Sequence, residues 1–166
     1  MIKRTLAEVA EMSGGKLLDQ QDAERQISGV SFDTRTLACG NLFVPLAAAR
    51  DGHDYIHTAM EKGASASFWQ EDHENQPQGI PLIIVKDTLA ALQQLAASYR
   101  NQLQVQVIGI TGSNGKTTTK DMIYAVLSTT YLVHKTQGNL NNHLGVPLTL
   151  LALDEDTEMA IVEMGM

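Results

Sequence analysis

The chain has 166 residues, of which 43% are hydrophobic and 19% charged, as is typical of a globular protein with one domain or two small ones. Its net charge of -7, without any cluster of Lys and Arg, argues against binding to nucleic acid. The single cysteine, Cys39, excludes an internal disulfide framework, and the sequence shows neither a signal peptide nor a membrane-spanning run. We therefore expect a cytoplasmic protein that contacts no membrane, and we further expect it to be a monomer.

Residues 1–85 carry alternating helix and strand signals. Thr5-Leu-Ala-Glu8 is a capping box, and the apolar residues after it predict a short helix ending near Gly14. A second helix is expected after Asp54, with Gly63 at its C-terminal end. Strands are predicted at 27–32, 41–46, 66–69 and 81–86.

A helix and a domain boundary follow the last of these strands. The residues from Asp87 to Tyr99 predict a capped helix with one apolar face. A new series of strands and helices starts beyond it. We therefore divide the chain into a first domain at 1–85, a connecting helix at 86–104 and a second domain at 105–166.

The strongest signal is the stretch from Val105 to Thr119. An apolar run rich in β-branched residues predicts a buried strand, Gly112 to Gly115 predicts a tight loop, and Lys116 opens a segment of helical periodicity. This arrangement binds phosphate, because the N–H groups of the loop and the positive end of the helix attract an anion. The Lys116 ammonium can reach the β- and γ-phosphates, and the Thr117 hydroxyl can bind Mg²⁺. The apolar positions of the helix are Met122, Ile123, Val126 and Leu127.

The loop departs from the general phosphate-loop pattern in one respect. The pattern G-x-x-x-x-G-K-[ST] would place its first glycine at Ile110, whereas this chain has glycines at 109 and 112. The alternative is a glycine turn between a core strand and a helix, with an ordinary surface lysine. Because a strand and a helix flank the motif as the chemistry requires, we predict a nucleoside triphosphate site.

The rest of the chain continues the second domain. A short strand at 131–134 leads into a polar loop rich in amides, and a helix is predicted over 146–153. The apolar strand 159–163 ends in Glu163, where an acid can reach the Mg²⁺ of a phosphate loop, since ligands of open α/β sheets gather beyond the carboxyl ends of the strands. The alternative is an ordinary acid at a strand end. Three strands make a thin doubly wound sheet, so we expect a fragment of a longer enzyme.

Several motifs together are similar to the Mur ligase family. The loop Thr111–Thr118 resembles the family's ATP loop, commonly T-G-[ST]-x-G-K-T, in which the first glycine is displaced. Five further runs resemble the members that add D-alanyl-D-alanine: 33–35, 41–44, 51–54, 138–150 and 161–165. The resemblance covers nearly the whole chain. It implies an α/β protein, with a small N-terminal domain at 1–85 that binds a UDP-linked substrate, followed by the start of a P-loop ATPase domain with a doubly wound, mostly parallel sheet.

The resemblance implies an ATP-dependent ligase of peptidoglycan precursor synthesis, with ATP and Mg²⁺ as cofactors. ATP would phosphorylate the terminal carboxylate of UDP-N-acetylmuramoyl-tripeptide to an acyl phosphate. The amine of D-alanyl-D-alanine would then attack, and ADP and phosphate would leave. Because two anions must approach each other, charge neutralisation and positioning would carry much of the catalysis.

The implied site draws on both regions of the chain. The ATP-binding residues are Thr111, Gly112, Ser113, Asn114, Gly115, Lys116, Thr117 and Thr118. Lys116 and His143 are the catalytic candidates, and Thr117 and Glu163 are the candidate Mg²⁺ ligands. The candidates for substrate contact are Ser31, Thr34, Arg35, Asn139 and Asn142.

Several of these candidates also have a purely structural interpretation. His143 fits equally well as a loop histidine bonded to a backbone carbonyl. The amides of Asn139 and Asn142 could stabilise turns through their own backbone. Arg35 could form a surface pair with an aspartate, and such pairs are common and weak.

Three other functions remain open at this stage. Within the same superfamily, the chain could come from the ligase that adds the third peptide residue or from a folylpolyglutamate synthetase. From a different class, it could be a nucleotide-binding module without ligation chemistry. Binding of a UDP-linked sugar would argue against that module.

Overall fold

A computed structural model describes residues 1–47 and 50–165, and its internal contacts divide the chain into two compact units. One unit is Ile2–Ser98, and the other is Tyr99–Met166 together with Met1. The division falls inside a long helix, α3 (Thr88–Gln102), close to the predicted boundary region. Both units mix helices with parallel strands, which confirms the predicted α/β class.

The first unit is built on a five-stranded sheet with the order β2-β7-β6-β5-β4. Strand β2 runs antiparallel to its neighbour, and the other pairs are parallel. Strands β1 and β3 form a separate antiparallel pair. The elements are β1 (Lys3–Thr5), α1 (Leu6–Ser13), β2 (Lys16–Leu17), η1 (Gln20–Asp22), β3 (Gln26–Ser28), β4 (Val30–Ser31), β5 (Leu42–Phe43), η2 (Gly52–Tyr55), α2 (Ile56–Glu61), β6 (Ala66–Gln70) and β7 (Leu82–Val85).

Local sequence signals explain where α1 begins and ends. The Thr5 hydroxyl accepts from the N–H of Glu8, and the Glu8 carboxylate accepts from the N–H of Thr5, so the predicted capping box is present. Gly14 ends the helix in the left-handed conformation at φ +69°, which a residue with a Cβ adopts only with strain. The predicted first helix is thereby confirmed.

Two predicted elements differ from the structure. The strand expected over 27–32 is broken at Gly29, whose φ of +81° turns the chain, so that β3 pairs with β1 and β4 with β5. The helix expected after Asp54 is present as α2, but the 3₁₀ turn η2 precedes it, and the Asp51 carboxylate caps that turn by accepting from the N–H of His53.

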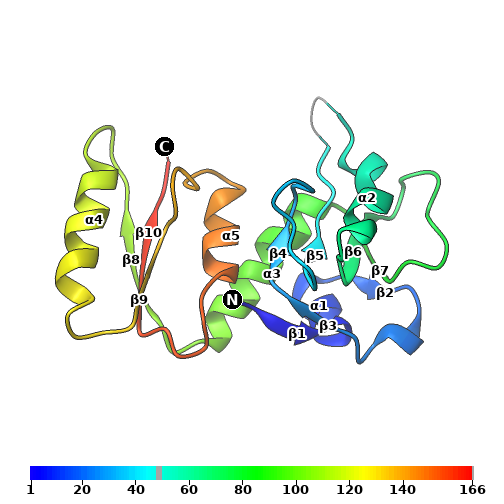
Figure 1. The fold of residues 1–166 in the computed structure, drawn as a ribbon, viewed down its shortest axis with the longest axis horizontal. Helices are drawn as coiled ribbons and strands as arrows, with labels where there is room; N and C mark the ends of the chain where they lie inside the picture. The colour runs from blue at the N-terminus through cyan, green and yellow to red at the C-terminus, as the bar shows by residue number, and fades with distance from the viewer. Residues whose placement is uncertain (48–49, 166) are drawn as a thin grey trace. The chain divides into compact units, whose positions relative to one another are not determined.

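The second unit is a small three-layer structure around a parallel sheet with the order β8-β10-β9. Figure 1 shows α4 and α5 on opposite sides of this sheet, which is the doubly wound arrangement that the sequence predicts. Tyr99, fully buried, donates from its hydroxyl to the carbonyl of Leu153 at 2.8 Å. The elements are β8 (Gln106–Ile110), α4 (Lys116–Leu127), β9 (Val133–Lys135), α5 (Gly145–Leu151) and β10 (Met159–Glu163).

Helix α4 presents an unexpected face to its sheet. Met122 and Val126, two of the apolar positions in the sequence pattern, are 65% and 70% exposed. The residues turned inward recur instead at Lys120, Ile123, Tyr124 and Leu127, and Lys120 is the most buried of them. The helix was predicted correctly, but the most buried residue of its inner face is a lysine. Lys120 can be buried there because it forms an ion pair with Glu163, which is also buried.

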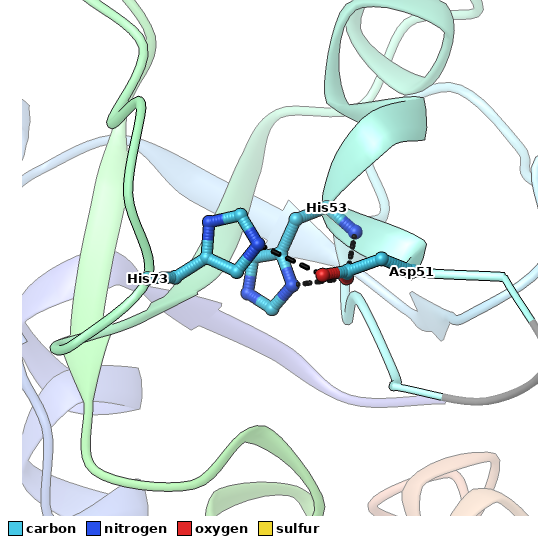
Figure 2. A group of neighbouring side chains, drawn as sticks. All are labelled: Asp51, His53 and His73. Atoms are coloured by element: carbon cyan, nitrogen blue, oxygen red, sulfur yellow. Dashed lines mark hydrogen bonds and ion pairs between the residues drawn. The ribbon is translucent and has the colours of Figure 1, made fainter.

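A cluster of Asp51, His53 and His73 links η2 to the loop after β6 (Figure 2). Asp51 Oδ1 lies 2.7 Å from His53 Nδ1, and Asp51 Oδ2 lies 2.8 Å from His73 Nε2. The two imidazoles stack with centroids 4.0 Å apart, and Trp69 meets both edge-on. The cluster therefore fixes the polar loop against the core of the first unit.

The hydrogen bonds of the cluster indicate which ring nitrogens of the two histidines carry a proton. His53 Nε2 accepts from the N–H of Gln70 at 3.4 Å, so His53 carries its proton on Nδ1 and donates it to Asp51. His73 donates from Nδ1 to the carbonyl of Glu74 at 2.7 Å and from Nε2 to Asp51, and this requires the doubly protonated form. The pKa of Asp51 falls to about 2, mainly through the backbone N–H of His53.

The pKa of His73 should fall when Asp51 loses its charge. Burial lowers the pKa of His73, but the hydrogen bonds to Asp51 and Glu74 more than compensate, so that it is raised above 6.5. The Asp51→Asn substitution removes the negative charge that favours protonated His73 but leaves the imidazole equally buried. The pKa of His73 should therefore drop, as measured by NMR titration of the imidazole resonances. Asp72→Asn, a neighbouring carboxylate bonded to Gln70, is the matched control and should leave the titration nearly unchanged. An unchanged pKa of His73 in Asp51→Asn would contradict this account.

The same shift sets a pH window for stability. Because the folded pKa of His73 is raised, its contribution is complete below the unfolded pKa of about 6.5 and is lost as the pH rises through the folded pKa. The depressed pKa of Asp51 acts in the opposite direction, so its contribution is present above about pH 4 and is lost as the pH falls toward 2.

Candidate functional site

The phosphate loop lies between β8 and α4, as the motif predicts. Strand β8 ends at Ile110 and α4 begins at Lys116, so the residues between them form the turn. Gly112 and Gly115 have φ values of +140° and +77°, which favour glycine at both positions. Lys116 folds back over the loop and donates from Nζ to the carbonyl of Gly112 at 2.5 Å. All eight predicted ATP residues therefore lie on one loop and the first turn of the helix that follows it.

Glu163 ends the strand next to β8 and reaches this loop. In the parallel register, Glu163 pairs with Ile110, so both strands end at the same edge of the sheet. The Thr117 hydroxyl donates to Glu163 Oε2 at 3.2 Å. Sequence reasoning proposed these two residues as Mg²⁺ ligands, and the fold brings their oxygens together.

The two oxygens suit a magnesium ion. Mg²⁺ binds hard oxygen ligands at about 2.1 Å in octahedral geometry, so neighbouring ligand oxygens lie about 3 Å apart. A hydroxyl and a carboxylate at 3.2 Å match that donor chemistry and spacing. Thr117 and Glu163 are the residues of this chain that would hold the ion.

The carboxylate of Glu163 is buried and contacts the side chains of Thr117, Lys120 and Asn141. The residue is 2% exposed, and its Oε2 also lies 3.1 Å from Nζ of Lys120. Its Oε1 accepts from Nδ2 of Asn141 at 2.9 Å, and its backbone N–H donates to the Thr136 hydroxyl at 2.9 Å. The bond from Asn141 and the charge of Lys120 outweigh burial and lower the pKa of Glu163. The carboxylate is therefore ionised, as a metal ligand must be.

The amide-rich loop contributes differently from the prediction. Asn139 is exposed, whereas the Asn142 side chain accepts from the N–H groups of Leu144 and Gly145 and caps α5. His143 is exposed on the same loop. It is Asn141, which sequence reasoning did not select, that contacts Glu163. The run of asparagines was the available signal, but it did not distinguish one asparagine from the next.

The three substrate candidates of the first unit lie at the end of β4 and on the turn that follows it. The Ser31 hydroxyl donates to the carbonyl of Asp33 and accepts from its N–H, while the carbonyl of Thr34 accepts from Lys62 at 2.6 Å. The Arg35 side chain, 86% exposed, pairs with both oxygens of Asp33 at 2.6 to 3.0 Å. That pairing lowers the pKa of Asp33 to about 2. The alternative of an Arg–Asp surface pair is therefore the arrangement present in this structure.

Within 1–47 and 50–165, one group of side chains has the composition of a metal site: Asp51, His53 and His73. Their ligand atoms lie within 4.8 Å of one another. If His53 bound a metal through Nδ1, its proton would move to Nε2, which faces the N–H of Gln70. Two donors would then oppose each other, so the geometry favours a proton-bridged cluster over a metal centre. In the same described residues, no helix is both long and apolar enough to cross a membrane.

Two family models match the chain. Residues 26–100 match the Mur ligase family catalytic domain, and residues 110–166 match the Mur ligase middle domain. The second match begins at the end of β8 and includes the phosphate loop, Asn141 and Glu163. The two models thus cover four of the five strands of the large sheet in the first unit and the site of the second.

Characterised proteins and solved structures agree with this assignment. The UDP-N-acetylmuramoyl-tripeptide–D-alanyl-D-alanine ligase of Bacillus subtilis is 54% identical over 100% of this chain and 36% of its own length. A crystal structure of MurF from Acinetobacter baumannii superposes with a TM-score of 0.89 at 32% identity, covering 100% of this chain and 36% of that one. MurF ligase from Thermotoga maritima in complex with ADP gives a TM-score of 0.70 at 32% identity, covering 82% and 32%.

The chain therefore spans about a third of the length of the relatives that it matches. The similarity to them runs through the phosphate loop and through the strand that ends in Glu163. With two models that together match most of its residues, and relatives that align along its whole length, the chain belongs to the Mur ligase family.

Proposed function

We propose that this chain is part of an ATP-dependent ligase that adds D-alanyl-D-alanine to UDP-N-acetylmuramoyl-tripeptide through an acyl phosphate. The observation that carries the proposal is the placement of Glu163 at 3.2 Å from the Thr117 hydroxyl, beside a phosphate loop. The name of the Bacillus subtilis relative, 54% identical to this chain, supplies the substrate pair. We also propose that the enzyme is cytoplasmic, where ATP is available, and that it acts as a monomer.

The proposed mechanism assigns a task to each part of the second unit. The N–H groups of residues 111–118 and the start of α4 bind the phosphates of ATP. Lys116 stabilises the phosphoryl group during its transfer to the substrate carboxylate. A Mg²⁺ ion held by Thr117 and Glu163 would neutralise charge on the phosphates. These charges reduce the repulsion between two anions, which is the main obstacle to forming the acyl phosphate.

The remaining candidates are proposed to contact the peptide substrate or its UDP group. His143 and Asn139 are exposed on the loop that carries Asn141, and we propose that they approach the muramoyl-peptide. Asn142 caps α5 with its side-chain oxygen, so its amide nitrogen is the group proposed for substrate contact. We further propose that Ser31, Thr34 and Arg35 bind the uridine diphosphate, with Arg35 exchanging Asp33 for a phosphate.

The test of the overall function is a ligation assay on the complete protein with three acceptors. We expect ADP release and product formation with UDP-N-acetylmuramoyl-tripeptide and D-alanyl-D-alanine. Free lysine or a free diamino acid with UDP-muramoyl-dipeptide should be inactive, and so should glutamate with a folate. Turnover with either of the last two pairs would replace this proposal by one of the related ligases. Nucleotide binding without affinity for the UDP-linked substrate would favour a non-catalytic module.

Lys116→Ala should reduce ligation by about 100-fold or more, because one fixed charge on the transferring phosphoryl group is lost. The measurement is steady-state turnover at saturating ATP, with circular dichroism to verify the fold. Lys135→Ala is the matched control, since Lys135 lies in the same unit and pairs with Asp121 at 2.8 Å. Near-normal turnover of Lys116→Ala would exclude the assigned role.

Glu163→Gln should raise the Mg²⁺ concentration needed for half-maximal ADP binding by about tenfold or more, because a neutral amide is a poor ligand for a hard cation. Calorimetric titration with ADP at a series of Mg²⁺ concentrations measures this directly. Binding of ADP in the presence of EDTA should change little, since the loop itself is intact. If the Mg²⁺ dependence matches that of the wild type, Glu163 does not bind the metal.

A further inference from the structure

Lys120 is a buried charge that the proposed chemistry does not use. It lies one turn beyond Lys116 on α4 but faces the sheet, and only 2% of its surface is exposed. Its Nζ lies 3.1 Å from Oε2 of Glu163 and 3.4 Å from the carbonyl of Gly138. A buried ammonium is unfavourable unless it is paired. The ion pair with Glu163 therefore explains why Lys120 is buried.

Asn141 holds the other side of the same carboxylate. Its Nδ2 donates to Oε1 of Glu163 at 2.9 Å, and its backbone carbonyl accepts from the N–H of Gly165 at 2.6 Å. The backbone of Asn141 is thus hydrogen-bonded to the segment just beyond β10, while its side chain donates to the Glu163 carboxylate. With Lys120 on one oxygen and Asn141 on the other, the carboxylate is held from both sides.

This arrangement sets the direction in which Glu163 presents its oxygen. Oε2 is held at 3.2 Å from the Thr117 hydroxyl, at the edge where the phosphate loop begins. A buried ion pair is by itself weak evidence for a contribution to stability, because apolar residues of similar volume are often as stabilising in its place. Partners that orient a ligand are, in contrast, a general requirement of metal sites.

We propose that Lys120 and Asn141 are positioning residues that hold the Glu163 carboxylate toward Thr117, so that both Mg²⁺ ligands are arranged before the metal–nucleotide complex binds. The inference rests on the proposed function, in which Glu163 is a ligand of Mg²⁺. Lys120 exerts a second effect of opposite sign, because its positive charge repels a nearby cation. The proposal states that positioning outweighs this repulsion.

Calorimetry of ADP binding to the complete protein tests the proposal without relying on turnover. Lys120→Met should raise the half-maximal Mg²⁺ concentration about 10- to 100-fold, and Asn141→Ala about tenfold, as expected for partners of a metal ligand. ADP binding in EDTA should change by no more than a few-fold, because neither residue belongs to the phosphate loop. A merely structural role would weaken binding equally with and without Mg²⁺.

Lys135→Met is the control for the loss of a lysine ion pair in the same unit. Lys135 on β9 pairs with Asp121 on α4 at 2.8 Å, and it contacts neither Thr117 nor Glu163 in the described structure. Its substitution should leave the Mg²⁺ dependence of ADP binding unchanged. A shift comparable to that of Lys120→Met would show a general electrostatic effect and overturn the proposal.

The remaining outcomes are also decisive. Tighter Mg²⁺ binding by Lys120→Met would mean that repulsion dominates, and the proposal would be wrong. If Lys120→Met does not fold, Asn141→Ala decides alone, since it removes no charge and should fold. If Glu163→Gln raises the Mg²⁺ requirement but neither positioning variant does, the further inference fails while the proposed function stands. If Glu163→Gln itself has no effect, the metal role of Glu163 fails first.

Discussion

The buried pair between Lys120 and Glu163 connects the parts of the second unit on which its chemistry depends. It joins the inner face of α4 to the end of β10, and through Gly138 it also reaches the amide-rich loop. Both side chains are only 3% exposed, so neither charge could persist there without the other. The Glu163 carboxylate therefore couples the positions of three segments: α4, the end of β10 and the amide-rich loop. The phosphate loop begins at the end of β8, the strand next to β10, so the same contacts also place it beside Glu163.

The first unit shows a related use of aspartates, but on polar turns. Hydrogen bonds from Arg35 lower the pKa of Asp33 to about 2. Hydrogen bonds from His53, first from its backbone N–H, and from His73 lower the pKa of Asp51 to about 2 as well. Asp33 lies in the turn that follows β4, and Asp51 caps the 3₁₀ turn η2. The difference lies in exposure, because Arg35 is open to solvent whereas His53 is buried. An exposed pair of this kind is weak and can exchange partners, whereas the cluster around Asp51 includes one buried imidazole, that of His53.

Much of the fold followed from local signals, whereas the details of the site depended on distant partners. The capping box at Thr5 and the strand–loop–helix order around Lys116 are local motifs, and both were predicted correctly. The prediction that this strand is buried was wrong, because β8 is at the edge of its sheet and is mostly exposed. Lys120 was missed because a lysine in an amphipathic helix ordinarily indicates the solvent face, and its burial depends on Glu163, which is distant in the sequence but adjacent in the fold. Asn141 was missed because neighbouring asparagines have the same chemistry, and only the turn decides which one faces inward. The break at Gly29 required a positive φ that the sequence allows but does not demand.

The place of Trp69 in the first unit has a practical consequence for spectroscopy. It is the only tryptophan of the chain, and it packs in the core of the unit Ile2–Ser98, beside both imidazoles of the histidine cluster. Its fluorescence emission therefore follows the unfolding of that unit alone, whereas far-ultraviolet circular dichroism follows the helices of both. Two denaturation curves that coincide would indicate one cooperative transition, and two that separate would reveal units that melt independently.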